Sequence, residues 1–573
     1  STVVDYRARA RVHFGVKDLK GFAHTFREMC DKGIADTAAC NMALQASVEL
    51  KDVESARAVW GFMESTGIQL NATTCDKYVR ACLTAVDPAA AVDALEHVLE
   101  KGRRVPGGDV LFGAALKQLL SGPTASAENV ALANKVFGMM QRKAPVQKGQ
   151  HPKRRDVGLR AVGGVLKLHA LNEDIDALQT LWKRQVALFH HLDSNPRKKG
   201  YQNSNLNVRV AQRWLVVRDY LQALNIYLRT VHVDGEEKKM YVADIEGALM
   251  LGLDCGVTVD AVVPQAFLQG MHAMERLGQL DAVARGIMLF QTLEKAMASV
   301  GSSPHTVALN KYLSLVHRFS SFQKDGQTTV QLLREKGLFD LEPMGRHSTT
   351  VGPDGASPFA LQPGFLSELN MFLLENPKRY IFDILHNAGR PNKSPYRTSP
   401  DTSTFNFCLK ILNNHLHSSN NALHGEIWKE RWDNYLEDYT RYAVDIKKRM
   451  EQNKDTLPDT TTYNNLLEIC GSTPFGMKLA SKLYVEMLNK QIKRNEHTHT
   501  KMLRALSRRM QYYQWELTRG YVPKIKTDEF KIYFMMLSQK IKEDGLSETG
   551  AVPIFLSTAK QELQGCVDSV VVV

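Results

Sequence analysis

The stretch Pro458–Asn495, PDTTTYNNLLEICGSTPFGMKLASKLYVEMLNKQIKRN, decides the fold of this 573-residue chain because it is one copy of a repeat. Its opening returns as PDTSTFNFCLKIL from Pro400 and as HTVALNKYLSLV from His305. Its closing phrase, an apolar residue followed by Met or Leu and then Lys-Gly-Ile, returns in FREMCDKGI, GFMESTGI, HVLEKG and LLREKGL. A self-similar unit of this size predicts a solenoid of stacked repeats.

The repeat length can be measured near the N-terminus, where the copies are clearest. Gly33, Gly67 and Gly102 close three successive phrases, 34 and then 35 residues apart. Between Thr37 and Asn71, apolar residues recur at helical spacing in two runs that a short polar break separates. Gly67 is suited to the left-handed residue that follows a helix. Each period therefore predicts a helix-turn-helix hairpin, and the whole chain is predicted to be all-α.

The unit resembles that of the pentatricopeptide repeat family. It opens on Asp-Thr-Thr-Tyr-Asn and closes on an apolar-Met…Gly-Ile phrase with Asp or Asn last, whereas the tetratricopeptide unit carries an early Trp and Leu-Gly and a late Pro. The best copies are 37–71, 72–106 and 459–495, and degenerate copies lie near 16–36, 109–145, 156–190, 206–234, 258–300, 306–338 and 401–458. The resemblance implies a right-handed α-solenoid of repeats of about 35 residues. A generic α-solenoid is the alternative.

Composition along the chain predicts four segments. Residues 1–337 are expected to form an N-terminal array and residues 365–520 a C-terminal array. Between them, residues 338–364 are rich in Pro, Gly and Ser, which is typical of an exposed linker. Residues 521–573 are expected to form a C-terminal helical extension.

One predicted helix, residues 422–450, is longer than the repeat requires. It carries an aromatic stripe, at steps of four, three, four and three residues, made of Trp428, Trp432, Tyr435, Tyr439 and Tyr442. Such a stripe packs on a neighbouring hairpin in one interpretation. In a second it contacts a partner protein, since aromatic residues are enriched at interface cores. Stacking with nucleic-acid bases is a third interpretation.

The chain is basic, with 73 Lys and Arg against 61 Asp and Glu and a net charge of +12. Dense positive charge occurs at 148–155, 197–199, 447–449 and 490–494, and the helical spacing of Arg504, Arg508 and Arg509 predicts one basic ridge. Any single cluster is explained by an ordinary solvated face. Their sum along a repeat array favours a bound polyanion, hence nucleic acid.

The family resemblance implies one RNA base per repeat, read by the residue after the aromatic in the first helix and by the last residue of the unit. An Asn amide suits this task because it donates and accepts at once. These slots hold Asn41 with Asn71, Asn406 with Asp459, and Asn464 with Asn495, while Asn310 and Thr500 fill the first slot of their units and Asp401 closes the unit before Asn406. With Arg504 and Arg508, these are the predicted RNA-binding residues.

The Asn pairs imply a preference for pyrimidines by the rules of the family. Asp76 and Gly113 depart from the pattern, because one offers only acceptors and the other has no side chain. The alternative interpretation is that each Asn is a polar residue at a helix N-terminus that satisfies the backbone.

Catalytic and cofactor sites are not predicted. Some members of the resembled family carry a zinc deaminase, which needs HxE and PCxxC motifs, and neither motif occurs. There is no Walker GxxxxGK[ST] sequence and no acidic cluster suited to a metal-dependent nuclease. The eight cysteines form no CxxC pair, which points to a reducing compartment. No apolar run is long enough to cross a bilayer. We therefore expect a non-enzymatic protein with no metal, no cofactor, no membrane partner and no small-molecule substrate.

The N-terminus suggests a compartment. The chain begins Ser-Thr-Val-Val without Met and continues into Arg7, Arg9 and Arg11, as a cleaved organellar presequence would leave it. An edited chain is the alternative. The family resemblance implies an organelle, and the mitochondrial matrix is preferred over the plastid.

These observations lead to one expected function and two alternatives. We expect an RNA-binding protein of mitochondrial gene expression that binds single-stranded or ribosomal RNA. It would be an architectural component of the small mitochondrial ribosomal subunit, or of its assembly intermediates, together with other proteins of that ribonucleoprotein. The first alternative is a free transcript-specific factor for RNA stability, processing or translation. The second is a protein scaffold that touches no RNA.

Overall fold

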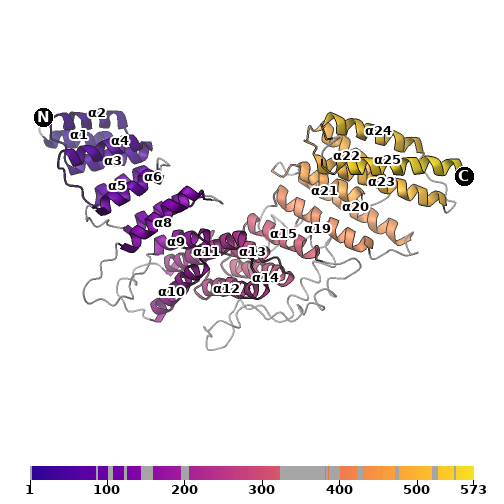
Figure 1. Ribbon diagram of the computed structural model, residues 1–573, viewed down its shortest axis with the longest axis horizontal. Coiled ribbons are helices and arrows are strands. Elements are labelled where there is room, and N and C mark those ends of the chain that lie inside the picture. The colour runs from indigo at the N-terminus through magenta and orange to yellow at the C-terminus, as the bar shows by residue number, and fades with distance from the viewer. Residues whose placement is uncertain are drawn as a thin grey trace. The chain divides into compact units, whose positions relative to one another are not determined.

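The fold was obtained as a computed structural model, shown in Figure 1. It describes residues 3–84, 88–100, 108–121, 125–142, 159–194, 206–322, 381, 385, 400–421, 430–452, 455–471, 476–518, 527–546 and 550–572. All regular elements in this part of the chain are α-helices, which confirms the predicted fold class. None of these helices is both long enough and apolar enough to span a membrane.

The helices fall into two compact units, the first of which is Ser1–Val233. Its helices are α1 (Val3–Gly15), α2 (Leu19–Asp31), α3 (Thr37–Leu50), α4 (Val53–Ser65), α5 (Ala72–Thr84), α6 (Pro88–Glu100), α7 (Gly108–Leu119), α8 (Ala127–Arg142), α9 (Leu159–Leu171), α10 (Ile175–Ser194) and α11 (Leu206–Thr230). Helices α1 to α10 pair as antiparallel hairpins, and the first helix of each hairpin packs against the first helix of the next (Figure 1). This stacking is that of a solenoid.

The second unit is Asp234–Val573. Its helices are α12 (Gly235–Asp254), α13 (Val262–Leu277), α14 (Leu280–Ser299), α15 (Thr306–Ser320), α19 (Thr402–Asn421), α20 (Glu430–Gln452), α21 (Thr460–Gly471), α22 (Met477–Asn489), α23 (Glu496–Thr518), α24 (Thr527–Glu543) and α25 (Val552–Val572). Helices α13, α15, α19, α21, α23 and α25 pack each on the next. Thus α15 lies directly against α19, although residues 321–401 separate them in the sequence.

Most predicted copies of the repeat correspond to hairpins. The copies 37–71, 72–106 and 459–495 are the hairpins α3–α4, α5–α6 and α21–α22. The copies 109–145, 156–190, 258–300 and 401–458 likewise contain the pairs α7–α8, α9–α10, α13–α14 and α19–α20. The copy near 16–36 contains only α2, whose partner α1 begins already at Val3.

One predicted hairpin is wrong. The copy 206–234 contains a single continuous helix, α11, because no Gly or Pro interrupts the sequence between 206 and 230. The C-terminal residues are helical as expected, and α24 and α25 both pack on α23. The linker 338–364 and residues 323–338 of the copy 306–338 lie outside the described residues. The predicted segment boundaries therefore stay predictions.

The hairpin turns follow from the polar and glycine residues at the helix ends. Asp36 and Asp52 precede α3 and α4, and each side chain accepts a backbone N–H of the first turn, from Ala39 at 3.0 Å and Ser55 at 3.0 Å. Such caps satisfy donors that the helix itself leaves free. Gly67 follows α4 with φ +71°, which confirms its predicted left-handed conformation.

Successive hairpins are held together by stacked aromatic rings. Trp60 in α4 stacks on Tyr78 in α5, with ring centroids 4.4 Å apart. The same contact recurs between Phe290 in α14 and Tyr312 in α15, also at 4.4 Å. In both places the second helix of one hairpin meets the first helix of the next. The core therefore runs continuously along each stack of hairpins.

Candidate nucleic-acid interface

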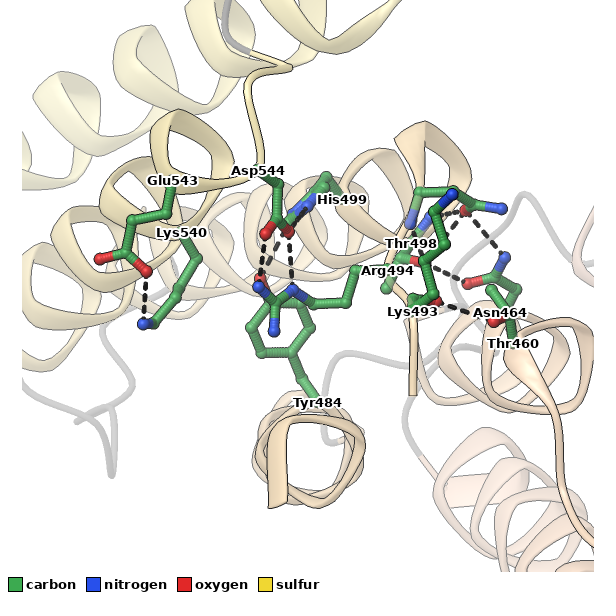
Figure 2. Close-up of polar contacts among 11 residues, drawn as sticks. Thr460, Asn464, Tyr484, Lys493, Arg494, Thr498, His499, Lys540, Glu543 and Asp544 are labelled. Carbon is green, nitrogen blue, oxygen red and sulfur yellow. Dashed lines mark hydrogen bonds and ion pairs between the residues drawn. The ribbon is translucent and has the colours of Figure 1, made fainter. Parts of the chain in front are cut away.

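The side chains of Asn464, Asn495 and Thr498 form a closed set of hydrogen bonds where α21 meets α23 (Figure 2). Asn464 Nδ2 donates to Asn495 Oδ1 at 3.2 Å, and Thr498 Oγ1 donates to Asn464 Oδ1 at 2.7 Å. Thr498 N–H completes the set by donating to Asn495 Oδ1 at 3.1 Å. We call this arrangement a polar ring.

The ring is built on the start of a helix. Asn495 directly precedes α23, and Thr498 is the third residue of that helix. While the Asn495 side chain accepts from Thr498 N–H, the Asn495 N–H donates in return to Thr498 Oγ1 at 3.2 Å. This reciprocal pair is a capping box with Thr in place of the usual Glu or Gln. The polar ring therefore joins a helix cap to the preceding repeat.

The same ring recurs where α19 meets α21. Asn406 Nδ2 donates to Asp459 Oδ1 at 3.1 Å, and Thr462 Oγ1 lies 2.8 Å from Asn406 Oδ1. Thr462 N–H donates to Asp459 Oδ1 at 2.8 Å, so Asp459 caps α21. The predicted pairs Asn406–Asp459 and Asn464–Asn495 are therefore both in direct contact.

Another ring, the first in chain order, lies where α15 meets α19, so the ring of Asn406 is the second and the ring of Asn495 the third. Asn310 Nδ2 lies 2.9 Å and 3.0 Å from the two carboxylate oxygens of Asp401. Thr404 Oγ1 donates to Asn310 Oδ1 at 2.6 Å, and its N–H donates to Asp401 Oδ1 at 2.8 Å. Asn310 and Asp401 were both predicted to occupy slots but were not predicted to pair, because residues 311–400 lie between them.

The pair Asn41–Asn71 does not form a ring within the described residues. Asn71 caps α5 through Thr74, whose N–H donates to Asn71 Oδ1 at 2.9 Å. Asn41 Oδ1, however, is buried without a hydrogen-bond partner. Asp76, which departs from the pattern, forms an ion pair with Arg80 at 2.8 Å in its own helix. The predicted pairing at Asn41 therefore lacks the contacts that the three rings share.

The series of rings also ends at α23. Thr500 occupies the first slot there, but its Oγ1 donates to the backbone carbonyl of His497 at 3.1 Å. The residue that precedes α25 is Ala551, which has no polar side chain to close a ring. Its N–H instead donates to the Glu496 carboxylate at 2.6 Å. The described residues thus hold three rings, on the successive first helices α15, α19 and α21.

Positive charge collects one helical turn beyond the ring residues. The carboxylate of Glu468 forms ion pairs with Lys501 and with Arg504 at 3.7 Å, and Lys410 lies near enough for its charge to act on Lys501. Burial lowers the pKa of Lys501 to about 8, and the charges of Arg504 and Lys410 add to this effect. Three cations and one carboxylate leave an excess of positive charge. Arg504 is half exposed and therefore accessible to an anion.

The predicted ridge of three arginines is wrong. The side chain of Arg509 is buried and lies 3.3 Å from Glu516 in an ion pair, because its position on α23 faces the interior. Arg508 is partly buried and donates to the Gly471 carbonyl at 3.2 Å. Arg504 alone of the three is exposed.

The other basic clusters are partly paired or lie outside the described residues. Lys447 and Lys490 share the carboxylates of Glu451 and Glu486 at 2.5–2.9 Å. The cluster at 490–494 ends in Arg494, which forms an ion pair with Asp544. The clusters 148–155 and 197–199 lie outside the part of the chain that the structure describes.

Asp544 connects the last hairpin to the residue beside Asn495. It accepts from Arg494 Nε at 2.7 Å and from His499 Nε2 at 2.8 Å (Figure 2). His499 is fully buried, and its Nδ1 lies 3.3 Å from the Tyr484 hydroxyl. Burial lowers the pKa of His499 despite the neighbouring carboxylate, so the imidazole is neutral at pH 7. Because Arg494 is the neighbour of Asn495, this contact fixes the loop that carries the third ring.

Only part of the aromatic stripe lies within the residues that the structure describes. Tyr439 is 2 % exposed and thus packs inside the protein, and Tyr442 is half-buried. At Tyr439 the partner-contact prediction is wrong, because this side chain is buried in the core. Trp432 and Tyr435 lie in α20 with side chains outside the described part, and Trp428 lies outside it altogether.

The described residues contain no group of three His, Cys, Asp or Glu side chains that could hold a metal ion. The thiols there are mostly buried, and burial raises the pKa of Cys40, Cys408 and Cys470 to about 12.

Comparison with known proteins finds no family model that matches the chain. It finds no match among curated proteins. Solved structures that are similar include the pentatricopeptide repeat protein PPR10 from maize, at 15% identity and a TM-score of 0.29, over 95% of this chain and 70% of that chain. Two structures of PPR10 in complex with an 18-nt psaJ RNA element are similar at 12% identity and a TM-score of 0.23, over 99% of this chain and 94% of theirs.

Proposed function

We propose that this chain is a non-enzymatic RNA-binding protein of the pentatricopeptide repeat type, whose three polar rings read bases of single-stranded RNA. The observation that carries the proposal is that the ring recurs on three successive first helices. It does so at the slots that the family resemblance assigns to base reading. The excess positive charge of Lys410, Lys501 and Arg504 lies one turn away, where phosphates would follow the bases.

Each ring leaves hydrogen-bonding capacity for a base. The Asn of the ring uses one of its two N–H groups and one lone pair of its oxygen, so one donor and one acceptor stay free. The carboxylates of Asp401 and Asp459 can only accept, which suits the imino N–H of uracil. In the third ring Asn495 uses its oxygen as a cap, so its Nδ2 is directed to an acceptor such as N3 of cytosine. We infer a preference for pyrimidines.

Fluorescence anisotropy with labelled RNA tests the proposal. The full-length protein is expected to bind an oligoadenylate that contains a pyrimidine run more tightly than the same oligomer without the run. Asn406→Ala and Asn464→Ala should each weaken this preference about fivefold to tenfold, the value of one or two hydrogen bonds. Asn41→Ala is the matched control and should leave the preference unchanged, because Asn41 belongs to no ring. Equal binding of both RNAs by the unmodified protein would refute base reading.

We further infer a role in mitochondrial gene expression within the mitochondrial matrix, as a component of the small ribosomal subunit or its assembly intermediates. Three consecutive rings support an architectural role over transcript selection, because three nucleotides recur by chance roughly once in 64 positions at one base per repeat. The compartment rests on the sequence resemblance.

Gradient sedimentation of tagged protein, with and without RNase, tests this role. Migration with a ribosomal subunit supports it. A light complex that RNase disperses supports the transcript-specific factor instead. A complex indifferent to both RNase and salt supports the protein scaffold.

A further inference from the structure

The three rings share a threonine that the family resemblance assigns no part in binding. Thr404, Thr462 and Thr498 each stand third in their helix, and each is 0 % exposed. A fully buried side chain cannot touch an RNA base. Each hydroxyl nevertheless lies 2.6–2.8 Å from the amide oxygen of the Asn in the preceding repeat.

The threonine hydroxyl determines which way the Asn amide points. An amide that turned over by 180° would place its NH₂ group toward the hydroxyl and its oxygen toward the cap residue. In the rings of Asp401 and Asp459 this would set the amide oxygen against a carboxylate, and neither has a proton to donate. In the third ring, Asn495 Oδ1 already accepts from Thr498 N–H, so it too repels an oxygen. The cap and the threonine therefore impose the same orientation from two sides.

The threonine proton is also restricted in direction. The backbone N–H of each cap residue donates to the threonine oxygen, at 3.1 Å for Asp401 and 3.2 Å for Asp459 and Asn495. With that lone pair used, the hydroxyl hydrogen points away from the cap N–H, toward the Asn oxygen at 2.6–2.8 Å and the cap side-chain oxygen at 2.8–3.1 Å. The Asn oxygen is the nearer acceptor for Thr404 and Thr498, and the two acceptors are equally near for Thr462. A buried Asn oxygen without this donor would carry an unsatisfied acceptor.

We propose that Thr404, Thr462 and Thr498 are positioning residues. They fix the amides of Asn310, Asn406 and Asn464 in one orientation and so make α15, α19 and α21 a reader of three consecutive nucleotides. The inference rests on the proposed function, since it concerns how the same bases are selected. It adds that selectivity depends on residues that never contact the RNA.

The chain contains a matched control. Thr74 is also 0 % exposed and forms the same capping box with Asn71, at 2.9 Å and 3.3 Å. Yet its hydroxyl bonds to Asn71 and to no Asn of the preceding repeat, since Asn41 Oδ1 is without a partner. Thr74→Val thus removes the cap contribution of the hydroxyl without touching a reading amide.

The experiment compares Thr462→Val, Thr462→Ser and Thr74→Val in the full-length protein. Anisotropy is measured with RNAs that carry a pyrimidine run, and with variants in which a purine replaces one nucleotide of the run. Thr462→Val is expected to reduce discrimination about fivefold at a single nucleotide, whereas Thr462→Ser retains it. Thr74→Val is expected to lower the melting temperature as Thr462→Val does but to leave discrimination intact. Where Thr462→Val does not fold, Thr404→Val and Thr498→Val put the same question at the neighbouring nucleotides.

The outcomes separate the two proposals. If the unmodified protein discriminates and Thr462→Val discriminates equally well, the positioning role is overturned while base reading stands. A serine variant that fails to retain discrimination would also overturn it. If the unmodified protein shows no preference among these RNAs, base reading itself is refuted, and the positioning role with it.

Discussion

At the scale of single residues, the candidate interface depends on side chains that divide their hydrogen bonds between the protein and a ligand. Asn406 and Asn464 are only 7 % and 8 % exposed, so each presents one edge of its amide rather than the whole group. An Asn amide that already forms hydrogen bonds within the protein, and that is held on a rigid helix, loses little side-chain entropy when it binds a ligand. Under the proposed function, the rings would therefore hold the Asn amides in place before any ligand binds.

Glu486 carries a prediction about acid stability. Burial opposes its ionisation, but Lys447, Lys490 and the Tyr463 hydroxyl, at 2.6–2.9 Å, lower its pKa to about 2. A pKa below the unfolded value means that this stabilisation is complete above about pH 4.5 and is lost as pH falls toward 2. Glu486→Gln is expected to lower the free energy of unfolding at pH 7 by about 1–2 kcal/mol. It should also flatten the loss of stability between pH 4.5 and 3.

Denaturant titrations at several pH values measure both effects. Glu54→Gln is the control, because Glu54 forms only an exposed pair with Arg57 and such pairs contribute little. An unchanged acid slope in Glu486→Gln would show that Glu486 is not the group that titrates.

The residues also show where sequence reasoning stopped. The pairs Asn406–Asp459 and Asn464–Asn495, 53 and 31 residues apart, were predictable because each joins the first slot of a recognised copy to the residue that closes that copy. Asn310–Asp401 was not, because the repeat length gives no register across an insertion. The threonines were visible in the repeated opening, as in PDTST and PDTTT, yet a hydroxyl at a helix start usually signals a cap alone. Their second bond, to a preceding repeat, needed three-dimensional packing.

At the scale of helices, the hairpins are set by how each helix begins and ends. Hairpin positions could be predicted well where Gly and Asp mark the ends, as at α3 and α4. The prediction of a hairpin failed at α11, because the degenerate copy has apolar residues at helical spacing but no residue that ends the helix. Periodicity shows which face of a helix is buried, while a turn requires its own residues.

Two positions in neighbouring turns allow a paired test of helix ends. Gly67 has φ +71° with no atom within 4 Å of a Cβ placed there, so Gly67→Ala meets only backbone strain. It is expected to destabilise the protein by about 1 kcal/mol. Lys51 adopts φ +56° after α3, so Lys51→Gly is expected to stabilise by about 0.5 kcal/mol. Thermal melts of both variants should shift in opposite directions, and shifts of equal sign would contradict the argument.

The contact between α23 and α24 predicts a pH dependence near neutrality. Burial lowers the pKa of His499 below its ordinary 6.5, although Asp544 favours the charged form. The folded state then binds fewer protons than the unfolded state, so stability is complete above about pH 6.5 and falls as pH drops below it. His499→Gln should reduce this fall in the free energy of unfolding between pH 6.5 and 5. The exposed His497, substituted in the same way, provides the control, and an identical pH profile for both variants would count against the role of His499.

At the scale of the whole molecule, the basic side chains differ in whether they are available to bind an anion. Several of the basic side chains that the structure describes lie in ion pairs, as at Lys447, Lys490 and Arg494. The group near Glu468 is different because Lys410, Lys501 and Arg504 lie near one another and only Lys501 and Arg504 pair with that carboxylate. Net charge alone therefore overstates how much basic surface is open to a polyanion. The sequence could not show which cations are paired with carboxylates and which are in excess.

The salt dependence of RNA binding follows from this distribution. A single strand releases about 0.7 counterion per neutralised phosphate, so three contacts give a slope of about −2 for log affinity against log salt. Lys410→Met combined with Arg504→Met should bring this slope about 1.4 closer to zero and weaken all RNAs alike. Base preference should be retained. Lys239→Met, which removes an exposed cation paired with Glu236, serves as the control. A slope unaffected by the double variant would exclude these cations as phosphate contacts.

The packing of α15 on α19 offers a use in protein engineering. The contact is noncovalent, and it includes hydrogen bonds from Asn414 to His317 and from Asn310 to Asp401. Two polypeptides, one ending after α15 and the other starting before α19, would carry complementary halves of one polar ring. An RNA that spans this contact would act as a template for their reassembly. A luciferase divided between the two fragments would then emit light only where its target RNA is present.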